Sequence, residues 1–324
     1  MDIQSTDSRT LLHTVARLHY EQDMSQRDIA QQMGLSTATV SRLIRRAREE
    51  GIVRIEIAEF VEPHSLAGQL ADELQLKQVA IAPTAPESGA MAALAEPVAR
   101  LLKDARLGPG TVLGLGWGRT VWEILQVGLP ALPGTTTVPL SGGIPEAARH
   151  FQIGEFARLA ASQIGGNPRF VHAPYLLSDE ARHALVRDPA ISGSVGLWER
   201  VDTALVGIGR PHGGDRTSGG AAITPDDPAL DHAAGDVLLR YFDISGRMVH
   251  WNREDQLLAI STAQLKRVPL LIGVAVSPLK AVSIIGAARS GLINALATDT
   301  RTAMRVLDVL RSSPPLQRAA GSPV

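Results

Sequence analysis

The sequence predicts an α/β protein built of two parts, a short helical N-terminal part and a larger part in which strands alternate with helices. Two observations support this fold class. Apolar residues recur at helical spacing up to about residue 50, and after Pro63 short apolar runs alternate with amphipathic stretches. The length of 324 residues corresponds to about two domains. Alternation of this kind indicates a mostly parallel sheet with helices on both faces, as in Rossmann-like domains.

The N-terminal part contains three predicted helices. The first carries apolar residues at helical spacing and ends within residues 20–23. Ser25 can cap the second helix, which has Asp28 three residues further on, and Gly34 can adopt the left-handed conformation that ends it. Ser36 can cap the third helix. The three elements are short, and the turn between the second and third is only a few residues long.

The second and third helices with their glycine turn form a helix-turn-helix pattern, SQRDIAQQMGLSTATVSRLIRRAR at 25–48. Ala30 is small where the two helices would cross. A miniature core is predicted from Ile29, Leu35, Val40 and Leu43. The third helix would present its first turns to base edges, where hydroxyl, methyl and guanidinium groups each have a partner. The candidate DNA contacts are Ser36, Thr37, Ala38, Thr39, Ser41, Arg42, Arg45 and Arg46.

The charge of the whole chain hides a local excess. The 32 Lys+Arg and 33 Asp+Glu residues give a net charge of −1, which by itself argues against a nucleic-acid partner. Between Ser36 and Arg48, however, there are four arginines and no acid. Such a face can pair with DNA phosphates, whereas the alternatives are a solvated basic face or a winged-helix module for protein contacts. After Gly51, residues 52–57 alternate with period two and predict a strand or wing.

The larger part begins with a leucine-rich helix. Leu66, Leu70, Leu74 and Leu76 would share one face, so this helix is a candidate linker or dimer contact. Short apolar runs predict strands at 79–82, 111–115, 136–140, 169–173, 204–208, 270–274 and 293–297. Amphipathic stretches predict helices at 91–103, 121–125, 151–164, 179–187, 280–289 and 301–310.

These elements divide the chain into four expected regions. Residues 1–59 form the helix-turn-helix domain, with a wing, and residues 60–78 the linker or dimerisation helix. Residues 79–312 form the α/β domain. The tail at 313–324 is rich in Pro, Ala and Ser, and we expect it to be disordered.

Composition excludes several classes of function. The chain has no cysteine, which excludes disulfides, thiolate catalysis and cysteine-based zinc sites. The nine histidines lack the H-x-x-x-H and H-E-x-x-H spacings, so we expect no metal site, and no cofactor is indicated. No G-x-S-x-G nucleophile elbow occurs, and we assign no catalytic residue. Without an apolar run of membrane-spanning length or a signal-peptide core at 1–10, a soluble cytoplasmic protein with no membrane partner is expected.

A glycine-rich loop follows the predicted strand at 111–115. It reads GLGWGRT at 114–120, and its glycines allow a tight turn close to an anion at the start of the next helix. The G-x-G-x-x-G fingerprint of dinucleotide sites is incomplete, because Arg119 occupies the position of the last glycine. Arg119 and Thr120 suit a phosphate or polyhydroxy ligand instead. The candidate ligand residues of this loop are Gly116, Trp117, Gly118, Arg119 and Thr120.

Three further loops follow predicted strands. Gly142 and Gly143 come after 136–140, Gly209 after 204–208, and Lys280 after 270–274. The chain has only four lysines, so a lysine just beyond a buried strand is a candidate phosphate contact. Open α/β sheets bind ligands at the carboxyl ends of their strands, where all these loops would lie.

The combination resembles the SorC family of bacterial sugar-binding transcription regulators, often grouped with the DeoR type. The resemblance rests on the helix-turn-helix sequence together with GLGWGRT, VGIG, GDVLLRYFDISGR and GVAVSPLKAVSIIGAARSGLINALATD, and it covers about residues 10–310. It implies an effector domain with the fold of sugar-phosphate isomerases and deaminases. It also implies operator DNA and a sugar, polyol or sugar phosphate as partners, and assembly into a homodimer or homotetramer.

The resemblance also assigns individual residues. It implies that GLGWGRT cradles the effector, that Asp236 bonds sugar hydroxyls, and that Lys280 contacts a phosphate. Asp243 is either a second polar contact or a cap of the turn that follows it. The family commonly has a glycine-bearing turn after GVA, whereas this chain has Val276, Ser277 and Pro278 there.

Each assignment has a simpler alternative. Arg119 could pair with a carboxylate, Lys280 could be a solvated lysine, Asp236 could be a turn residue, and Trp117 could either stack on a sugar or anchor its loop.

Two functions of different classes are consistent with these residues. The first is a ligand-switched transcription regulator, most simply a repressor of a carbohydrate or polyol operon. The second is a sugar-phosphate isomerase or deaminase with an appended DNA-binding module, since fold alone does not decide function. The second needs a general base, and none can be assigned from the sequence.

Overall fold

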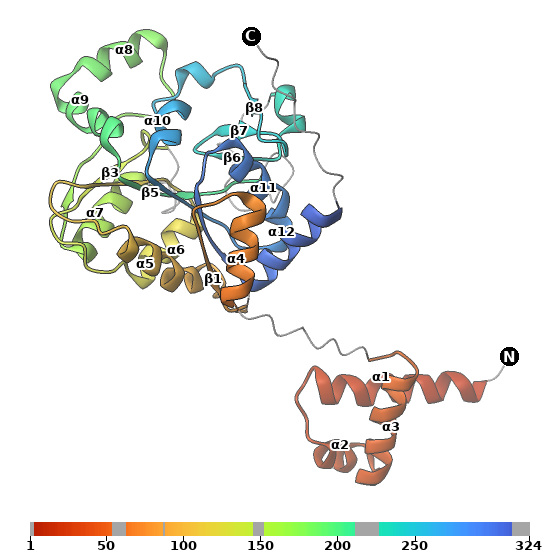
Figure 1. Ribbon diagram of the computed structural model, residues 1–324. Coiled ribbons are helices and arrows are strands. Elements are labelled where there is room, and N and C mark those ends of the chain that lie inside the picture. The colour runs from red at the N-terminus through yellow and green to blue at the C-terminus, as the bar shows by residue number, and fades with distance from the viewer. Residues whose placement is uncertain (1–2, 54–62, 87, 145–151, 211–226, 313–324) are drawn as a thin grey trace. The chain divides into compact units, whose positions relative to one another are not determined.

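The computed structural model describes residues 3–53, 63–86, 88–144, 152–210 and 227–312 (Figure 1). By its internal contacts the chain divides into two compact units, Met1–Phe60 and Val61–Val324. The α/β class predicted from the sequence is confirmed, with helices alone in the first unit and a parallel sheet in the second.

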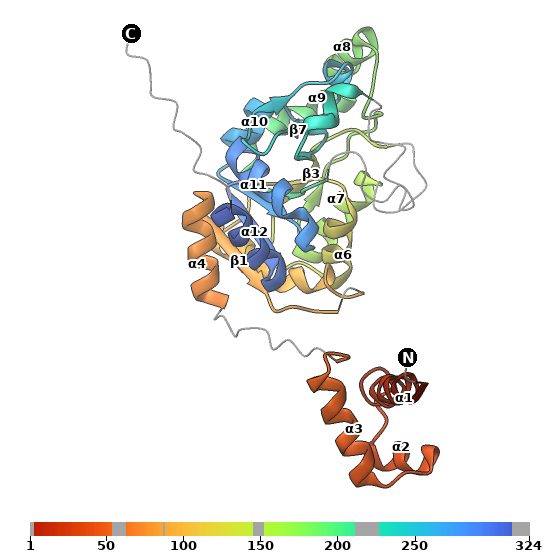
Figure 2. The ribbon, with the colours of Figure 1, turned by 90° about the vertical axis from the view of Figure 1, so that its right-hand side faces the viewer.

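The N-terminal unit consists of three helices. They are α1 (Ile3–Tyr20), α2 (Gln26–Met33) and α3 (Thr37–Glu49), seen from a second side in Figure 2. The predicted caps are confirmed. The Ser25 hydroxyl accepts from the Asp28 amide at 3.2 Å, and Gly34, at φ 65°, ends α2. The Ser36 hydroxyl likewise accepts from the Thr39 amide at 3.1 Å and begins α3.

The core of this unit joins all three helices. Ile29 and Val40 are fully buried against Val15 of α1, while Leu35 and Leu43 are half-buried at its edge. Because α2 and α3 each have one apolar face, this packing fixes the angle between them and leaves the polar face of α3 outside. The predicted wing falls mostly on 54–57, which lie outside the described residues.

The second unit is built on a seven-stranded parallel sheet. Its strand order is β1-β10-β9-β5-β2-β3-β4. The strands are β1 (Gln78–Ala82), β2 (Val112–Leu115), β3 (Thr136–Pro139), β4 (Asn167–Pro168), β5 (Thr203–Gly207), β9 (Leu270–Val274) and β10 (Ala295–Asp299). The central strands are buried on both faces, which explains their continuous apolar sequences.

Helices cover both faces of the sheet (Figures 1 and 2). One face is packed by α5 (Ala95–Asp104), α6 (Arg119–Val127) and α7 (Ile153–Ile164), and the other by α4 (Pro63–Leu74), α11 (Ala281–Ser290) and α12 (Thr300–Ser312). The peripheral helices are α8 (Asp179–Arg187), α9 (Pro189–Val195) and α10 (Thr262–Arg267). Short 3-10 turns lie at Ala92–Leu94, Gly196–Arg200, Pro228–His232, Glu254–Gln256 and Pro278–Lys280.

Helix α4 belongs to the α/β unit, which corrects the prediction of a linker or dimer helix at 60–78. Leu66, Leu70, Leu74 and Leu76 are all buried in the same core as α11, α12 and β1. The apolar face that suggested a contact with another molecule is therefore used inside the chain. The linker that the sequence placed at 60–78 begins on residues outside the described part, and from Pro63 onward the chain is part of this fold.

A small antiparallel sheet adjoins the carboxyl ends of the parallel strands. It consists of β6 (Gly235–Val237), β7 (Arg240–Phe242) and β8 (Met248–Val249). A β-bridge between Gly209 and Asp236 ties it to the loop after β5. This connection brings β6 to the edge of the large sheet at which an open α/β fold binds its ligands.

Among the described helices, none has both the length and the apolar character needed to cross a membrane.

Candidate functional site

The outer face of α3 carries the predicted DNA contacts. Six of the eight residues are exposed, namely Ser36, Thr37, Ala38, Arg42, Arg45 and Arg46, while Thr39 and Ser41 are half-buried. The buried side of the same helix holds Val40, Ile44 and Ala47. The helix therefore turns one apolar stripe to the core and one polar, positively charged stripe outward, as a recognition helix does.

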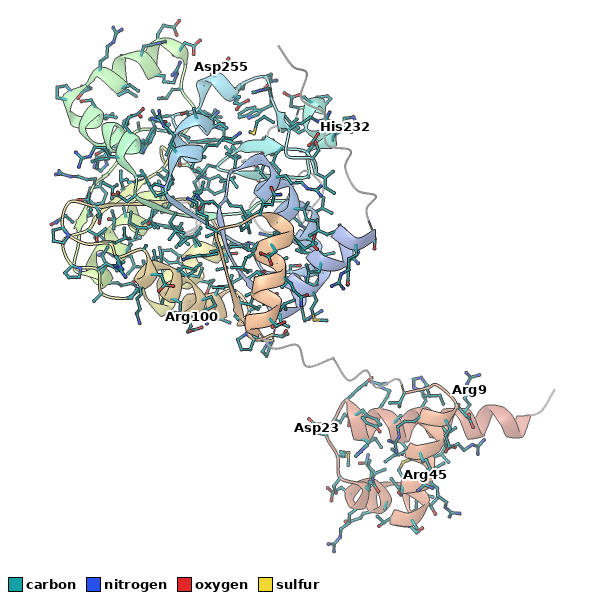
Figure 3. The ribbon with its side chains drawn as sticks, viewed as in Figure 1. Arg9, Asp23, Arg45, Arg100, His232 and Asp255 are labelled. Carbon is teal, nitrogen blue, oxygen red and sulfur yellow. The ribbon has the colours of Figure 1, made fainter. Side chains whose placement is uncertain are left out.

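The arginines of α3 differ in their partners. Arg46 pairs with Glu50 at 2.6 Å, so a phosphate would have to displace that carboxylate. Arg42 reaches the Thr39 hydroxyl at 3.5 Å. Arg45, labelled in Figure 3, has no hydrogen-bond or ion-pair partner within the described residues. The sequence window from Ser36 to Arg48 contains no acid, and the partner of Arg46 lies two residues beyond it, so this pairing was not foreseen.

A second candidate site lies where the order of the large sheet reverses. From β2 the chain moves outward to β3 and β4, and then returns to the other side of β2 with β5, followed by β9 and β10. In open α/β sheets, a reversal of strand order of this kind marks the place where ligands bind, at the carboxyl ends of the strands. The loops with GLGWGRT, Gly209 and Lys280 all lie at this edge, as expected.

Gly116 and Gly118 of GLGWGRT are each required to be glycine for a different structural reason. A Cβ atom on Gly116 would lie 3.2 Å from Cγ1 of Val206 and 3.3 Å from Cδ2 of Leu238, so the backbone passes close to both. Gly118 has φ 130° and open space where a Cβ would stand, and it precedes α6 without any side-chain cap. The first turn of α6 therefore keeps its N–H groups open to a ligand.

The polar residues of this loop are arranged as a binding loop would require. Arg119 is exposed and Thr120 is buried. Trp117 is half-buried and packs against three separate apolar clusters, in agreement with the anchoring alternative. The loop is thus held by Trp117 while Arg119 faces outward.

Gly142 and Gly143 are explained by backbone packing. The Gly142 N–H donates to the carbonyl of Leu258 and the Gly143 N–H to that of Ala173, each at 2.8 Å. A Cβ on Gly142 would collide with the carbonyl oxygen of Pro174. Since both amides are already bonded, the prediction that these glycines bind the effector gains no support from their geometry.

Gly209 is required by Asp236. The Gly209 N–H donates to the main-chain oxygen of Asp236 at 2.9 Å, and a Cβ on Gly209 would overlap with the Asp236 carboxylate. The other carboxylate oxygen accepts from the Leu239 amide at 3.0 Å. Burial raises the pKa of Asp236 to about 6, against the opposing effects of the Leu239 amide and of Lys280. Asp236 therefore bonds within its own turn, as the simpler alternative held, but its carboxylate also lies against Gly209 and interacts electrostatically with Lys280.

Lys280 reaches the same place from the loop after β9. Its Nζ donates to the carbonyl of Ile208 at 2.6 Å, directly beside Gly209. Burial lowers the pKa of Lys280 to about 8, Asp236 opposes this shift, and Arg119 and Arg210 add to it. The structure therefore brings Arg119, Gly209, Asp236 and Lys280 together, and the alternative of a solvated Lys280 is wrong.

Arg210 and Tyr241 belong to this site but escaped sequence reasoning. Arg210 follows Gly209 and acts electrostatically on Lys280. Tyr241 lies opposite Asp236 in the β6–β7 pairing and is buried, and burial together with Asp236 and Tyr175 raises its pKa. The sequence could have indicated Arg210, because it directly follows a strand. No local pattern indicates Tyr241, because it meets Asp236 only through the pairing of β6 with β7.

The turn between β6 and β7 has an unusual backbone. Leu238 and Leu239 are both left-handed, with φ 53° and 61°, and both side chains are buried. Left-handed conformations cost a non-glycine residue roughly 1 kcal/mol or more each. Burial of the two leucines and the bond from the Leu239 amide to Asp236 offset this cost. The turn thereby holds the carboxylate in place.

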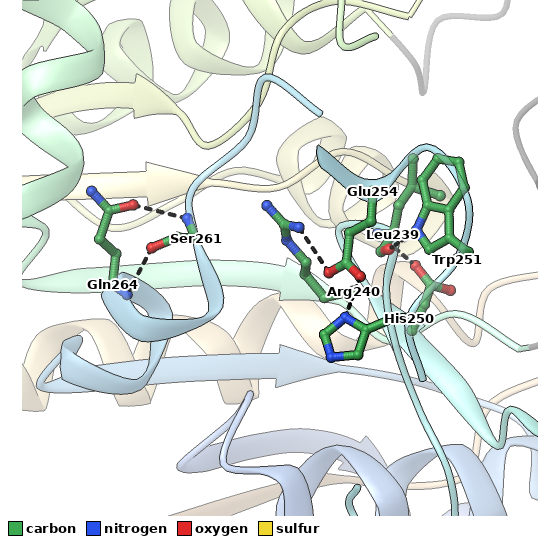
Figure 4. Close-up of polar contacts among 8 residues, drawn as sticks. Leu239, Arg240, His250, Trp251, Glu254, Ser261 and Gln264 are labelled. Carbon is green, nitrogen blue, oxygen red and sulfur yellow. Dashed lines mark hydrogen bonds and ion pairs between the residues drawn. The ribbon is translucent and has the colours of Figure 1, made fainter. Parts of the chain in front are cut away.

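A buried ion pair supports that turn from the other side (Figure 4). Arg240 donates to Glu254 at 2.9 Å, and their side chains are only 11% and 12% exposed. The second Glu254 oxygen lies 2.7 Å from Nδ1 of His250, and the Trp251 indole donates to the Leu239 carbonyl at 3.3 Å. Nearby, Ser261 and Gln264 form a capping box that begins α10.

Asp243 was predicted to be either a second polar contact or a cap of its turn. Its carboxylate accepts from the Ser245 hydroxyl within that turn and pairs with Arg247.

The arrangement is suited to a polyhydroxy ligand that bears or neighbours negative charge. Asp236 can accept from hydroxyls, Lys280 and Arg119 can donate, and the open turn of α6 offers amides. No cluster of three or more acids or histidines able to hold a metal occurs in the described part of the chain.

Comparisons with known proteins give matches to both units of the chain. The family model described as "Putative sugar-binding domain" matches residues 58–308, and a model of sigma-70 region 4 matches residues 16–50, which span most of the three N-terminal helices. The chain is 31% identical to the sorbitol operon regulator of Klebsiella pneumoniae, over 94% of this chain and 100% of the relative. It is 27% identical to the deoxyribonucleoside regulator of Bacillus subtilis, over 91% and 96% of the two chains.

The fold agrees as well. The crystal structure of full-length SorC from Klebsiella pneumoniae superposes with a TM-score of 0.70, covering 92% of this chain and 98% of that one. These relatives regulate transcription and are not enzymes, so the alternative of an isomerase or deaminase is set aside. The chain belongs to the SorC family of sugar-binding transcription regulators.

Proposed function

We propose that this regulator binds operator DNA through α3. Its affinity for the operator changes, or is lost, when a sugar, a polyol or one of their phosphates binds at the carboxyl ends of β2, β5 and β9. The observation that carries the effector site is the convergence of Asp236 from β6 and Lys280 from the loop after β9 on the Gly209 loop. The relative named sorbitol operon regulator makes polyols the first class to test. A protein with operator DNA as its partner would act in the cytoplasm.

The DNA interface rests on two contributions. Arg45, and Arg46 after release from Glu50, would pair with phosphates, while Thr37, Ala38 and Arg42 would meet base edges. A dimer or tetramer would place two such helices about 34 Å apart, or a multiple of that, on one face of the duplex. We propose repression as the mode, with effector binding favouring an assembly that fits the operator less well.

The proposal is tested in two linked measurements. A thermal-shift screen of free and phosphorylated sugars and polyols identifies compounds that stabilise the protein. Fluorescence anisotropy on the DNA upstream of the regulator's own coding region then measures affinity with and without each compound. We expect salt-dependent, specific binding that at least one stabilising compound weakens tenfold or more. Specific binding that no stabilising compound changes would contradict the effector site, and no specific binding would contradict the operator role.

A further inference from the structure

The turn between β9 and α11 has a backbone conformation that favours glycine but carries a serine. Ser277 has φ 127° and ψ 130°, in the region that side-chain-bearing residues rarely adopt. It lies three residues before Lys280, at the edge of the effector site. A serine kept in such a conformation indicates that its side chain or its amide makes interactions that offset the strain.

The amides of this turn are all engaged within the chain. The Ser277 N–H donates to the Thr302 hydroxyl at 2.9 Å, and the Leu279 N–H donates to the Ser277 hydroxyl at 3.3 Å. The Lys280 N–H donates to the Ser277 carbonyl at 2.9 Å, and that of Ala281 to the carbonyl of Pro278. Pro278 has no N–H. From Ser277 to Ala281 no backbone donor is left for a ligand.

The start of α6, after β2, differs from this turn in its free backbone donors. There Gly118 has no side chain, no cap is present, and the space around it is open. A phosphate needs several convergent donors, and backbone amides at a turn usually supply them. At the β9–α11 turn no backbone amide remains, and the only donors left are the Ser277 hydroxyl proton and two of the three protons of Lys280, because Ile208 already accepts the third.

We propose that Ser277 is a specificity-determining residue, which closes this turn to a phosphate so that the part of the effector next to Lys280 is a hydroxyl. A hydroxyl needs only one or two partners, and Lys280 and Asp236 supply one donor and one acceptor. Any phosphate of the effector then lies on the α6 side, next to Arg119. This inference rests on the proposed effector site and adds the orientation in which the effector is held.

The test uses inorganic phosphate and the full-length protein. Isothermal titration compares the wild type with Ser277→Gly, which frees the Leu279 amide and accepts the same backbone conformation. We expect phosphate affinity to rise at least tenfold, and to fall back in Ser277→Gly/Lys280→Gln. Gln75→Gly is the matched control, because Gln75 is also left-handed, at φ 54°, but is exposed directly after α4. It should bind phosphate as the wild type does.

A phosphate affinity of Ser277→Gly within twofold of the wild type would overturn the proposal. Ser277→Ala provides a second variant that retains a Cβ but removes the hydroxyl that accepts from Leu279, and it should show part of the same gain. The phosphate titration needs neither DNA nor the natural effector. Failure of this inference is therefore distinguishable from failure of the proposed function, which the anisotropy measurement reports separately.

Discussion

Single residues of α3 should affect DNA binding in different ways. Arg45 is exposed and without a partner in the described structure, so it is the arginine best placed to meet a phosphate. We expect Arg45→Ala to weaken binding to specific and random DNA alike and to reduce the slope of log affinity against log salt by about one. Anisotropy at several salt concentrations measures both quantities.

The matched comparison is Arg42→Ala, which removes the same charge one turn earlier on the same helix. We expect it to reduce the preference for operator over random DNA, because Arg42 lies next to Thr39 in the first turns that meet base edges. Equal losses on both DNAs for Arg42→Ala, or a loss confined to the operator for Arg45→Ala, would reverse these assignments.

Asp236 should make stability depend on pH in a defined direction. Burial raises its pKa to about 6 from 3.8, so the folded protein holds a proton that the unfolded chain has already released. The free energy of unfolding should therefore fall as the pH rises from about 4 through about 6, by roughly 2 kcal/mol. Lys280 affects stability in a different pH range. Because its pKa is lowered in the folded protein, the free energy of unfolding should rise between about pH 8 and the ordinary lysine pKa of 10.5.

Asp236→Asn removes the first of these effects. Urea unfolding of the wild type and of Asp236→Asn at about pH 4.5 and about pH 7 should show the variant gaining stability relative to the wild type at the higher pH. A difference between the two proteins that stays constant over this range would show that Asp236 does not titrate there.

At the scale of elements, helix α4 is a structural part of the effector domain. Leu70 is fully buried in the core shared with α11 and α12. We expect Leu70→Ala to lower the free energy of unfolding by about 3 kcal/mol. The control is Leu279→Ala, since that leucine is 72% exposed and its truncation removes little packing. Urea unfolding measures both, and a small loss for Leu70→Ala would place α4 outside the cooperative unit.

Local signals in the sequence predicted most elements. Ser25, Ser36 and Gly34 mark helix ends through bonds to residues only three or four positions away, and buried parallel strands appear as short apolar runs. The predicted strand at 169–173 is wrong, because β4 is only Asn167–Pro168. The Arg169 N–H still donates to the Thr137 carbonyl, but no further residue of 170–173 pairs with β3, and the next pairing is the bridge between Gly143 and Pro174.

The site was predictable where residues follow strands, and not where distant segments meet. Lys280 and Gly209 lie at the carboxyl ends of the strands, as predicted, because every parallel strand points the same way. The leucine face of α4 has the same period whether it packs inside the chain or on a partner, so its location could not be read from spacing. Tyr241 reaches Asp236 only through the register of β6 and β7.

At the scale of the whole molecule, the two sites must be coupled for the chain to act as a switch. Lys280 lies in the α/β unit and α3 in the N-terminal unit. We expect Lys280→Gln to leave operator affinity within about twofold of the wild type and to weaken the effector's ability to release DNA at least tenfold. Anisotropy with an effector from the thermal-shift screen measures both quantities. An unchanged effector response would remove Lys280 from the site.

The contact between Gly209 and the Asp236 carboxylate also constrains how this family member can change over generations. Any side chain at position 209 would occupy the space of that carboxylate. A substitution there is therefore harmful while Asp236 is present and becomes tolerable only after position 236 has acquired a smaller side chain. The order of the two changes is fixed, and the intermediate has already lost the carboxylate that we propose accepts from effector hydroxyls. A lineage could leave this ligand chemistry by that path, but it could return only by restoring glycine first.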